Sequence, residues 1–188
     1  MPRPKTRPDA DVLDAALELV HTRGPDALTF ATLSAACGLS ASTLVQRFGS
    51  KPALMRATLL HAWDRLDRKT ARLASEMPRT PEGAIALLAG LSRDYGGIEA
   101  NAEGLLVLRE DLRDPQLRAR GAAWKRALTA ALDACFAAVP SAPAGIGLLM
   151  ATQWQGSLLW WSFEPEGRVE DHVAASLARF VAAVLPPS

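Results

Sequence analysis

The chain has 188 residues, of which 49% are hydrophobic, and its formal net charge is +1. This composition supports a packed core and excludes a disordered chain, while the near-zero charge does not by itself indicate a nucleic-acid partner. The N-terminus lacks the apolar core of a signal peptide and no run approaches the roughly 18 apolar residues of a membrane span, so we expect a cytoplasmic protein without a membrane partner.

The first 50 residues predict three short helices. Alanine is abundant and isoleucine rare, which favours helices. Asp9 can cap a first helix, whose apolar residues recur at helical spacing until Gly24-Pro25 breaks it. Thr29 can cap a second helix over 30–37, and Ser40 can cap a third over 41–48. Two helices joined by a three-residue turn are typical of a helix-turn-helix.

The rest of the chain predicts six further helices. The first of these six is a long helix that Ser50-Lys51-Pro52 opens and that continues from 53 to about 75. The others are expected over 82–95, from an N-cap at Asn101 to Leu112, over 115 to about 139, over 148–163 and over 169–184. The sequence therefore predicts an all-α protein of about nine helices, with an N-terminal three-helix helix-turn-helix domain followed by a larger helical domain.

One stretch resembles a known family. Residues 27–54, "ALTFATLSAACGLSASTLVQRFGSKPAL", resemble the DNA-binding domain of the TetR family of transcriptional regulators. The threonine before the second helix, the glycine in the turn, Leu44, Phe48 and the Gly49-Ser50-Lys51 run carry the resemblance. It implies a DNA-binding domain over 1–51 and an effector-binding and dimerisation domain over 52–188. The implied function is that of a homodimeric regulator of a pseudo-palindromic operator, a repressor released by an apolar or aromatic small molecule.

The third helix carries the residue types that read a major groove. Gln46 can pair bidentately with adenine, while Ala41 and Thr43 can pack on thymine methyl groups. Backbone phosphates are held by hydroxyls, cations and helix N-termini. The candidate DNA-binding residues are Thr29, Ser40, Ala41, Ser42, Thr43, Gln46, Arg47 and Lys51. The alternative is that the hydroxyls are only helix caps or ordinary first-turn residues, and that the two longer side chains are only solvated.

Two positions depart from the family pattern. Val45 stands where the family often has tyrosine, and Arg47 where it often has histidine or tyrosine. The usual tyrosine contact to a phosphate is therefore missing, and Arg47 can replace part of it. A second reading stays open: an all-α ligand-binding or scaffolding protein with a vestigial helix-turn-helix.

The resemblance places an effector pocket among the fourth to seventh helices. Aromatic side chains and a glutamine in an apolar helix suggest its lining, although aromatics are more often core and the glutamine's partner is more commonly a neighbouring helix. The candidate effector-binding residues are Trp63, Tyr95, Leu105, Leu108, Trp124, Gln153 and Trp154.

The last two helices carry more apolar surface than one small domain can hide, which favours a symmetric interface between two copies. The candidate dimer residues are Leu158, Trp161, Val173, Leu177, Phe180 and Val184.

An enzyme is the remaining alternative. His21, His61 and His172 fall on three different predicted helices without metal-ligand spacing, and there is no nucleophile motif. Cys37 and Cys135 are too few and too distant for a zinc site. We therefore expect no catalysis, no metal and no cofactor.

Overall fold

The computed structural model describes residues 7–93 and 98–185, without the side chains of 98–102. These residues form α-helices and one short 3₁₀ helix and contain no strand, so the all-α prediction is confirmed for this part of the chain. Packing divides the chain into two compact units. The first comprises Met1–Arg65 with Ala102–Gly121, and the second Leu66–Asn101 with Ala122–Ser188.

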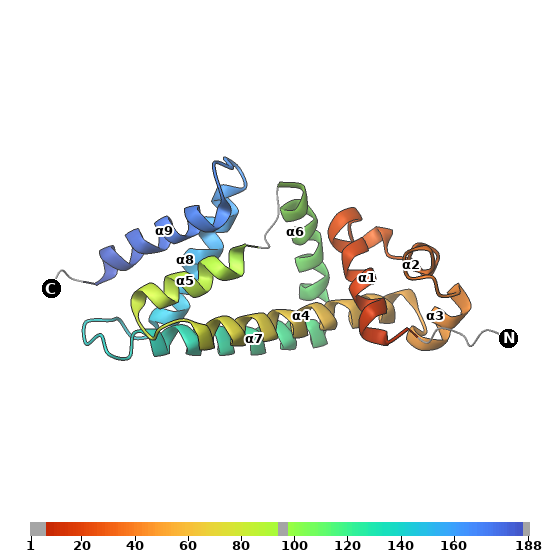
Figure 1. Ribbon diagram of the computed structural model, residues 1–188, viewed down its shortest axis with the longest axis horizontal. Coiled ribbons are helices and arrows are strands. Elements are labelled where there is room, and N and C mark those ends of the chain that lie inside the picture. Colours follow the sequence, from red (N-terminus) through yellow and green to blue (C-terminus); the bar gives the residue numbers. More distant parts are fainter. Residues whose placement is uncertain (1–6, 94–97, 186–188) are drawn as a thin grey trace. The chain divides into compact units, whose positions relative to one another are not determined.

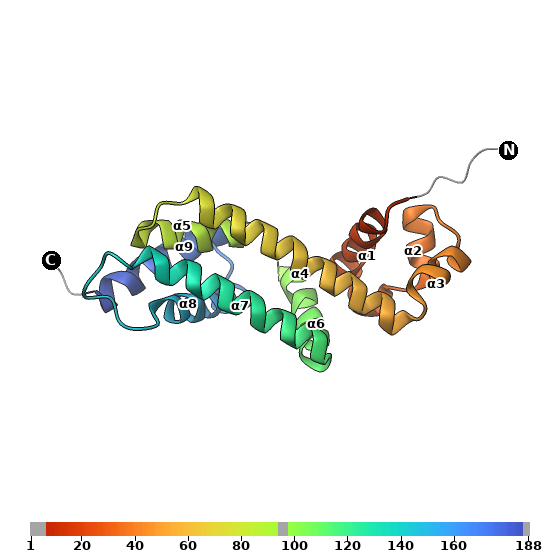
Figure 2. The same ribbon diagram turned by 90° about the horizontal axis from the view of Figure 1, so that it is seen from below.

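The first unit contains the helix-turn-helix. Its N-terminal elements are α1 (Asp9–Arg23), the 3₁₀ helix η1 (Pro25–Ala27), α2 (Phe30–Cys37) and α3 (Ala41–Phe48), followed by the start of α4 (Lys51–Glu76) (Figures 1 and 2). Gly38 ends α2 with a left-handed φ of 73°, a conformation that glycine adopts without steric cost. That turn lets α2 and α3 pack on each other.

One apolar core holds this unit together. Its fully buried members include Val12 of α1, Leu33 of α2, Leu44 of α3 and Leu54 of α4. Val107 of α6 (Ile98–Arg113) packs against the same core. The helix-turn-helix is thus fixed by α1, α4 and α6 as well as by its own short helices.

The second unit is built from the later helices. They are α5 (Pro81–Ser92), most of α7 (Pro115–Cys135), α8 (Ile146–Trp161) and α9 (Val169–Val184), together with the end of α4. Both α5 and α8 pack on α9 (Figure 1). At Gly147, the first turn of α8 approaches α7 so closely that an added Cβ would lie 2.2 Å from the Thr129 carbonyl oxygen.

Several helix boundaries differ from the predicted ones. Pro8 rather than Asp9 is the N-cap of α1, α5 ends at Ser92 rather than at residue 95, and α8 spans Ile146–Trp161 rather than 148–163. The backbone is already helical at Ile98, so Asn101 is not the N-cap of α6. The seventh helix ends at Cys135 instead of continuing to about Val139. Pro140 disfavours helical geometry at the residue before it, and the chain turns earlier, over residues 136–138. None of the described helices is long and apolar enough to cross a membrane. The functional division at residue 51 stays a prediction.

Candidate nucleic-acid interface

The third helix presents one exposed face. Ala41, Ser42, Val45 and Gln46 are exposed, whereas Leu44 is the residue of α3 that is fully buried. These four positions follow the i, i+1, i+4, i+5 spacing of a single helical face. Val45, 44% exposed, was missed as a candidate, although its place between Ala41 and Gln46 in this spacing could have identified it.

The hydroxyls before the two helices act as caps. Thr29 Oγ1 accepts a hydrogen bond from the Thr32 amide (3.1 Å), and the Thr32 hydroxyl accepts one from the Thr29 amide (3.0 Å). Ser40 Oγ accepts from the Thr43 amide at 3.1 Å and lies 2.9 Å from Ser42 Oγ. Both caps therefore satisfy helix N-termini, the role that the sequence left as an alternative to phosphate contact.

The two candidate phosphate-binding cations differ in their surroundings. Arg47 Nη1 donates to the Arg7 carbonyl oxygen (2.7 Å) and to Asp9 Oδ1 (3.1 Å), so this guanidinium ties α3 to the start of α1. Lys51 is exposed and its Nζ donates to the Asp26 carbonyl oxygen at 3.2 Å. Lys51 is the more accessible of the two for a phosphate.

A polar cluster joins α1 to α4. Asp14 Oδ1 accepts from His61 Nε2 and from Arg65 Nη1, each at 2.8 Å. The hydrogen bond from His61, together with the positive charge of Arg65, holds the pKa of the Asp14 carboxyl below its usual value. These contacts fix how α1, and with it the helix-turn-helix, sits on the first part of α4.

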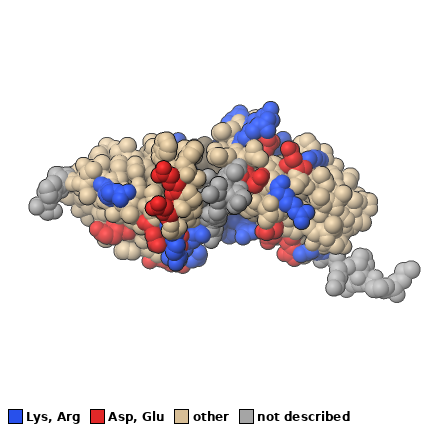
Figure 3. Space-filling view, turned by 90° about the horizontal axis from the view of Figure 1, so that it is seen from above, with Lys and Arg blue, Asp and Glu red and all other residues tan. Residues whose placement is uncertain are grey.

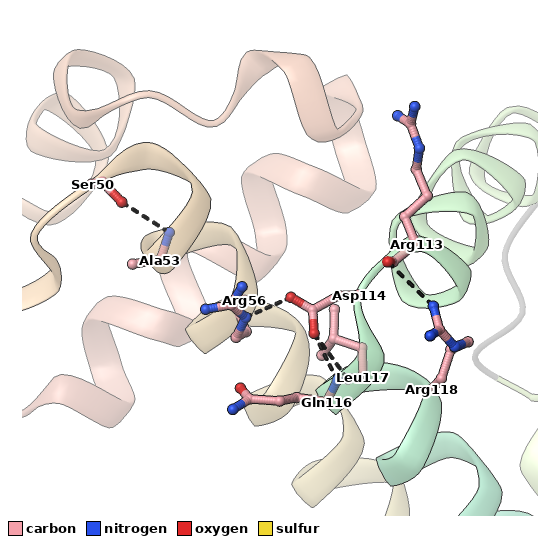
Figure 4. Close-up of polar contacts among 8 residues, drawn as sticks. All are labelled: Ser50, Ala53, Arg56, Arg113, Asp114, Gln116, Leu117 and Arg118. Atoms are coloured by element: carbon pink, nitrogen blue, oxygen red, sulfur yellow. Dashed lines mark hydrogen bonds and ion pairs between the residues drawn. The ribbon is translucent and has the colours of Figure 1, made fainter.

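A second polar cluster joins α4 to the turn between α6 and α7. Asp114 accepts from Arg56 Nε at 2.5 Å and from the Gln116 amide at 2.8 Å, so it both pairs with α4 and caps α7 (Figure 4). Arg118 Nη1 donates to the Leu112 carbonyl oxygen at the end of α6 (2.7 Å). The hydrogen bond from Arg56 lowers the pKa of Asp114. Arg113 points away from this ion pair (Figure 4).

Three predicted effector residues belong to the first unit. Trp63 is half-buried, its Nε1 donates to Asp111 Oδ1 at 3.1 Å, and its ring lies against Gly121, where an added Cβ would meet it at 3.1 Å. Burial raises the pKa of Asp111. Leu105 and Leu108 of α6 are exposed.

Three others belong to the second unit. Trp124 and Trp154 are buried with ring centroids 6.3 Å apart, and their indole N–H groups donate to the hydroxyls of Thr70 (3.0 Å) and Ser92 (2.8 Å). Gln153 Nε2 donates to Ser176 Oγ of α9 at 3.0 Å. The structure thus brings the two tryptophans together as core residues and gives the glutamine a neighbouring helix as partner.

The remaining effector candidate, Tyr95, lies outside the described residues. The second unit also has an open cavity of about 590 Å³, and the predicted effector residues that the structure describes do not line it. Its charged lining consists of Lys69, Arg72, Glu76, Arg93, Glu170 and Asp171.

The candidate dimer residues fall into two groups. Leu158, Trp161, Val173 and Leu177 are buried within the second unit, where they offer no surface to a partner, whereas Phe180 and Val184 are partly exposed. The exposed large apolar side chains of α8 and the residues after it are Leu148, Leu149, Leu159, Trp160 and Phe163. The large exposed apolar side chains of α8 and of Phe163 were therefore not among the predicted dimer residues, whereas the partly exposed Phe180 and Val184 were.

The N-terminal unit matches a known family. The model of the family described as "Bacterial regulatory proteins, tetR family" matches residues 12–58, the span from α1 to the start of α4. This part of the chain belongs to the TetR family. The resemblance expected from residues 27–54 is confirmed. No curated protein sequence matches the chain.

Solved structures of TetR-type regulators have a similar fold. A proposed TetR-family regulator from Mesorhizobium loti is 20% identical, with 98% of this chain and 100% of that one covered and a TM-score of 0.68. A proposed transcriptional regulator from Saccharomonospora viridis, in complex with choline, is 17% identical, with coverages of 94% and 96% and a TM-score of 0.72. The multidrug binding protein EbrR complexed with malachite green is 22% identical, with coverages of 98% and 100% and a TM-score of 0.66.

At these identities the likeness is one of fold, and it extends the TetR-type architecture over nearly the whole chain. Proteins of this family are DNA-binding transcriptional regulators. Within residues 7–93 and 98–185 no three His, Cys, Asp or Glu side chains gather as a metal-binding group.

Proposed function

We propose that the chain is a homodimeric transcriptional regulator that binds a pseudo-palindromic DNA operator and represses until a small molecule releases it. The observation that carries the DNA-binding part is the exposed face of α3 on a capped, well-packed helix-turn-helix. A major groove admits one α-helix, and α3 leaves nearly all its side chains outside the core. The vestigial alternative is disfavoured by this intact packing.

We assign contacts with bases and phosphates according to how exposed each candidate side chain is. Gln46 is assigned to an adenine and Ser42 to an adaptable polar contact, while Ala41 and Val45 pack on thymine methyl groups. Thr43 is partly buried and supports the first turn of the helix. Backbone phosphates are assigned to Lys51, Thr29, Ser40 and Arg47, the last with its remaining N–H groups. We add Val45 to the candidates because it shares the exposed face.

Dimerisation is proposed through the exposed apolar side chains at the two ends of α8, with the small, exposed Ala175, Ala178 and Ala182 of α9 beside them in the same unit. An apolar surface of this kind is typical of a symmetric contact. Two recognition helices in a dimer must lie about 34–36 Å apart to enter successive major grooves.

The effector is proposed to be an apolar or aromatic small molecule bound in the C-terminal domain. Small-molecule binding is supported by the fold, since the similar structures of EbrR and of the Saccharomonospora viridis protein hold malachite green and choline. Of these two ligands, malachite green is the aromatic one. The coupling element is α4, a single helix whose first part carries Lys51 and whose last part belongs to the second unit. A typical coupling of about 1–3 kcal/mol would lower operator affinity some 5–150-fold.

The test is selection of binding sites from random duplexes, followed by titration of variants. Gln46→Ala should relax the preference at one base pair per half-site by roughly 1–3 kcal/mol, since it removes a bidentate base contact. Lys51→Ala should weaken binding to all DNA sequences alike, because it removes a phosphate contact. Gln116→Ala, which changes an exposed glutamine at the start of α7, is the matched control and should change neither property.

A selection that enriches no sequence would sink the proposal. If an operator is found, the same titration with apolar and aromatic compounds tests the effector. Compounds that bind tightly without changing operator affinity would contradict ligand-controlled release and leave DNA binding intact.

A further inference from the structure

An open cavity lies in the first unit, beside the residue at which α4 begins. Its volume is about 530 Å³, within the range of roughly 300–1,000 Å³ that is usual for small-molecule sites. Its lining comes from η1, from the first turns of α4 and from the chain that joins the end of α6 to the start of α7, all within the first unit. The candidate effector residues that the structure describes do not line this cavity.

Part of the cavity wall is apolar. Leu117 is buried, and Met55 packs against the core of the helix-turn-helix. The apolar lining side chains are Pro25, Pro52, Met55, Pro115 and Leu117. Contact with such a wall removes apolar surface from water, which favours a ligand with an apolar body.

The charged part of the lining holds both signs. Its members are Lys51, Arg56, Arg113, Asp26, Glu110 and Asp114. Basic and acidic side chains are likewise interspersed over the face drawn in Figure 3. The sign of a ligand's charge is therefore decided by which of these side chains are already paired.

Two of the three acids are already paired. Asp114 Oδ2 accepts from Arg56 Nε, and its Oδ1 accepts from the amides of the first turn of α7 (Figure 4). Glu110 Oε1 lies 3.8 Å from Arg109 Nη1. Asp26 is then the one lining acid whose carboxylate has no cationic partner within the described part of the chain.

Two of the three cations lack a carboxylate partner. Lys51 Nζ donates to the Asp26 carbonyl oxygen, and no described carboxylate pairs with it. Arg113 points away from the Arg56–Asp114 ion pair, and its guanidinium forms no hydrogen bond or ion pair with any residue that the structure describes (Figure 4). The uncompensated charges at the cavity are thus two positive and one negative, which favours an anion.

We propose that this cavity binds a small amphiphilic anion, whose carboxylate pairs with Lys51 and Arg113 and whose apolar body lies against the apolar wall. The site goes beyond the function proposed above, and its effect on DNA rests on that function. Lys51 is assigned there to a backbone phosphate, so the bound carboxylate and the DNA compete for one ammonium group. The anion weakens operator binding, and the operator weakens binding of the anion by the same factor.

The first experiment needs no DNA. Isothermal titration calorimetry measures the affinity of the full chain for naphthoate, with naphthamide as a neutral probe of the same shape. Naphthoate should bind about tenfold more tightly, because hydrogen bonds to charged groups are stronger than neutral ones. Equal affinities for the two probes, or binding of neither, would overturn the proposal.

A variant locates the bound carboxylate. Arg113→Ala should weaken naphthoate binding roughly 2–5-fold, the usual range for an exposed charge pair. The matched control Arg126→Ala removes the same charge from an exposed position of α7 in the second unit and should keep the affinity of the full chain. Circular dichroism checks that both variants are folded. If Arg113→Ala binds naphthoate as tightly as the full chain does, the anion lies elsewhere and the proposal fails.

The second experiment measures operator affinity over a range of salt concentrations, with and without saturating naphthoate at matched ionic strength. Neutralising one phosphate contact should lower the slope of log affinity against log salt by about 0.9 and weaken binding roughly 5–10-fold at about 0.1 M salt. Lys51→Ala should already show the lower slope, and naphthoate should weaken its DNA binding no further.

The outcomes separate this proposal from the DNA-binding function. Operator affinity that naphthoate leaves unchanged would overturn the competition for Lys51, even where the anion binds. Selection of no operator would overturn the DNA-binding function, and the calorimetry of Arg113→Ala would still decide whether the cavity is an anion site.

Discussion

The sequence suggests two roles for Thr29, as a helix cap and as a phosphate contact, and the structure shows the geometry of the cap. Its hydroxyl accepts the Thr32 amide and its own amide is bonded by the Thr32 hydroxyl, a reciprocal capping box. A hydroxyl that accepts a hydrogen bond in this way still carries its own O–H, which can donate to a phosphate oxygen. Stability and DNA affinity must therefore be measured separately.

Replacing Thr29 by alanine should cost about 1 kcal/mol of the free energy of unfolding, because the first turn of α2 loses its cap. Denaturant unfolding gives this value. Replacing Thr29 by serine keeps the hydroxyl and should restore most of the stability. If alanine lowers operator affinity under conditions where the domain is fully folded and serine does not, the hydroxyl also contacts DNA. Unchanged stability of the alanine variant would contradict the capping role.

The exposed face of α3 was predictable from the sequence, whereas the intramolecular partners of its residues were not. The spacing of Ser42 and Gln46 around Leu44 already defines an exposed face, since helical periodicity is a local property. Arg47 has the same local pattern, yet it bonds Arg7 and Asp9, almost 40 residues earlier in the chain. That contact depends on the tertiary fold of the first unit, in which α1 and α3 share one core, and no local pattern encodes it.

Among the elements, the short N-terminal helices have the best-defined ends. Each of α2 and α3 has a capping hydroxyl at its N-terminus and a glycine at its C-terminus, and the predicted ranges of both helices agree with the structure. The predicted start of α6 was wrong: asparagine is a residue type that often caps helices, so the sequence favours Asn101 as the N-cap, but the backbone is helical from Ile98. A cap-forming residue inside a helix is not distinguishable from a cap by sequence alone.

The contact between α7 and α8 depends on Gly147. An alanine there would place its Cβ 2.2 Å from the Thr129 carbonyl oxygen and 2.8 Å from Asp133 Oδ1, the atom that accepts the Gly147 amide. Gly147→Ala should therefore destabilise the fold by roughly 1–3 kcal/mol, as the two helices must separate.

The matched control is Gly104→Ala in α6, where an added Cβ meets nothing within 4 Å. There the substitution should stabilise by up to about 1 kcal/mol through helix propensity. Thermal or denaturant unfolding measures the change in the free energy of unfolding for both variants. Equal effects at the two glycines would contradict the tight contact at Gly147.

At the scale of the whole molecule, the proposed dimer depends on which faces of α8 and α9 stay outside the core of one chain. The sequence reading placed Leu158 and Leu177 on the dimer surface, but both are buried in their own unit. The reason is physical: α8 is apolar on nearly every side, so its sequence has no periodicity that separates a face buried within the chain from one buried by a partner. Only tertiary packing makes that distinction.

We predict that Trp160→Glu/Phe163→Glu converts the dimer to a monomer, because it puts two charges on side chains that are each 71% exposed in the single chain. Sedimentation velocity measures the change. Leu106→Glu/Leu112→Glu, which alters exposed leucines of α6, should leave the dimer intact. A monodisperse dimer in the first variant would show that copies associate elsewhere, and a monomer before any substitution would remove the dimer from the proposal.

Helix α3, the proposed recognition helix, takes little part in holding the fold together. Leu44 is its only side chain fully inside the core, with Phe48 packed against the edge, so most of its surface can change with little effect on folding. If α3 reads DNA as proposed, substitutions at Ala41, Ser42, Val45 and Gln46 change which DNA sequence is bound and hardly affect stability. Such a protein can acquire new target sequences through single, individually tolerated steps, and it is a suitable scaffold for engineering operators that do not cross-react.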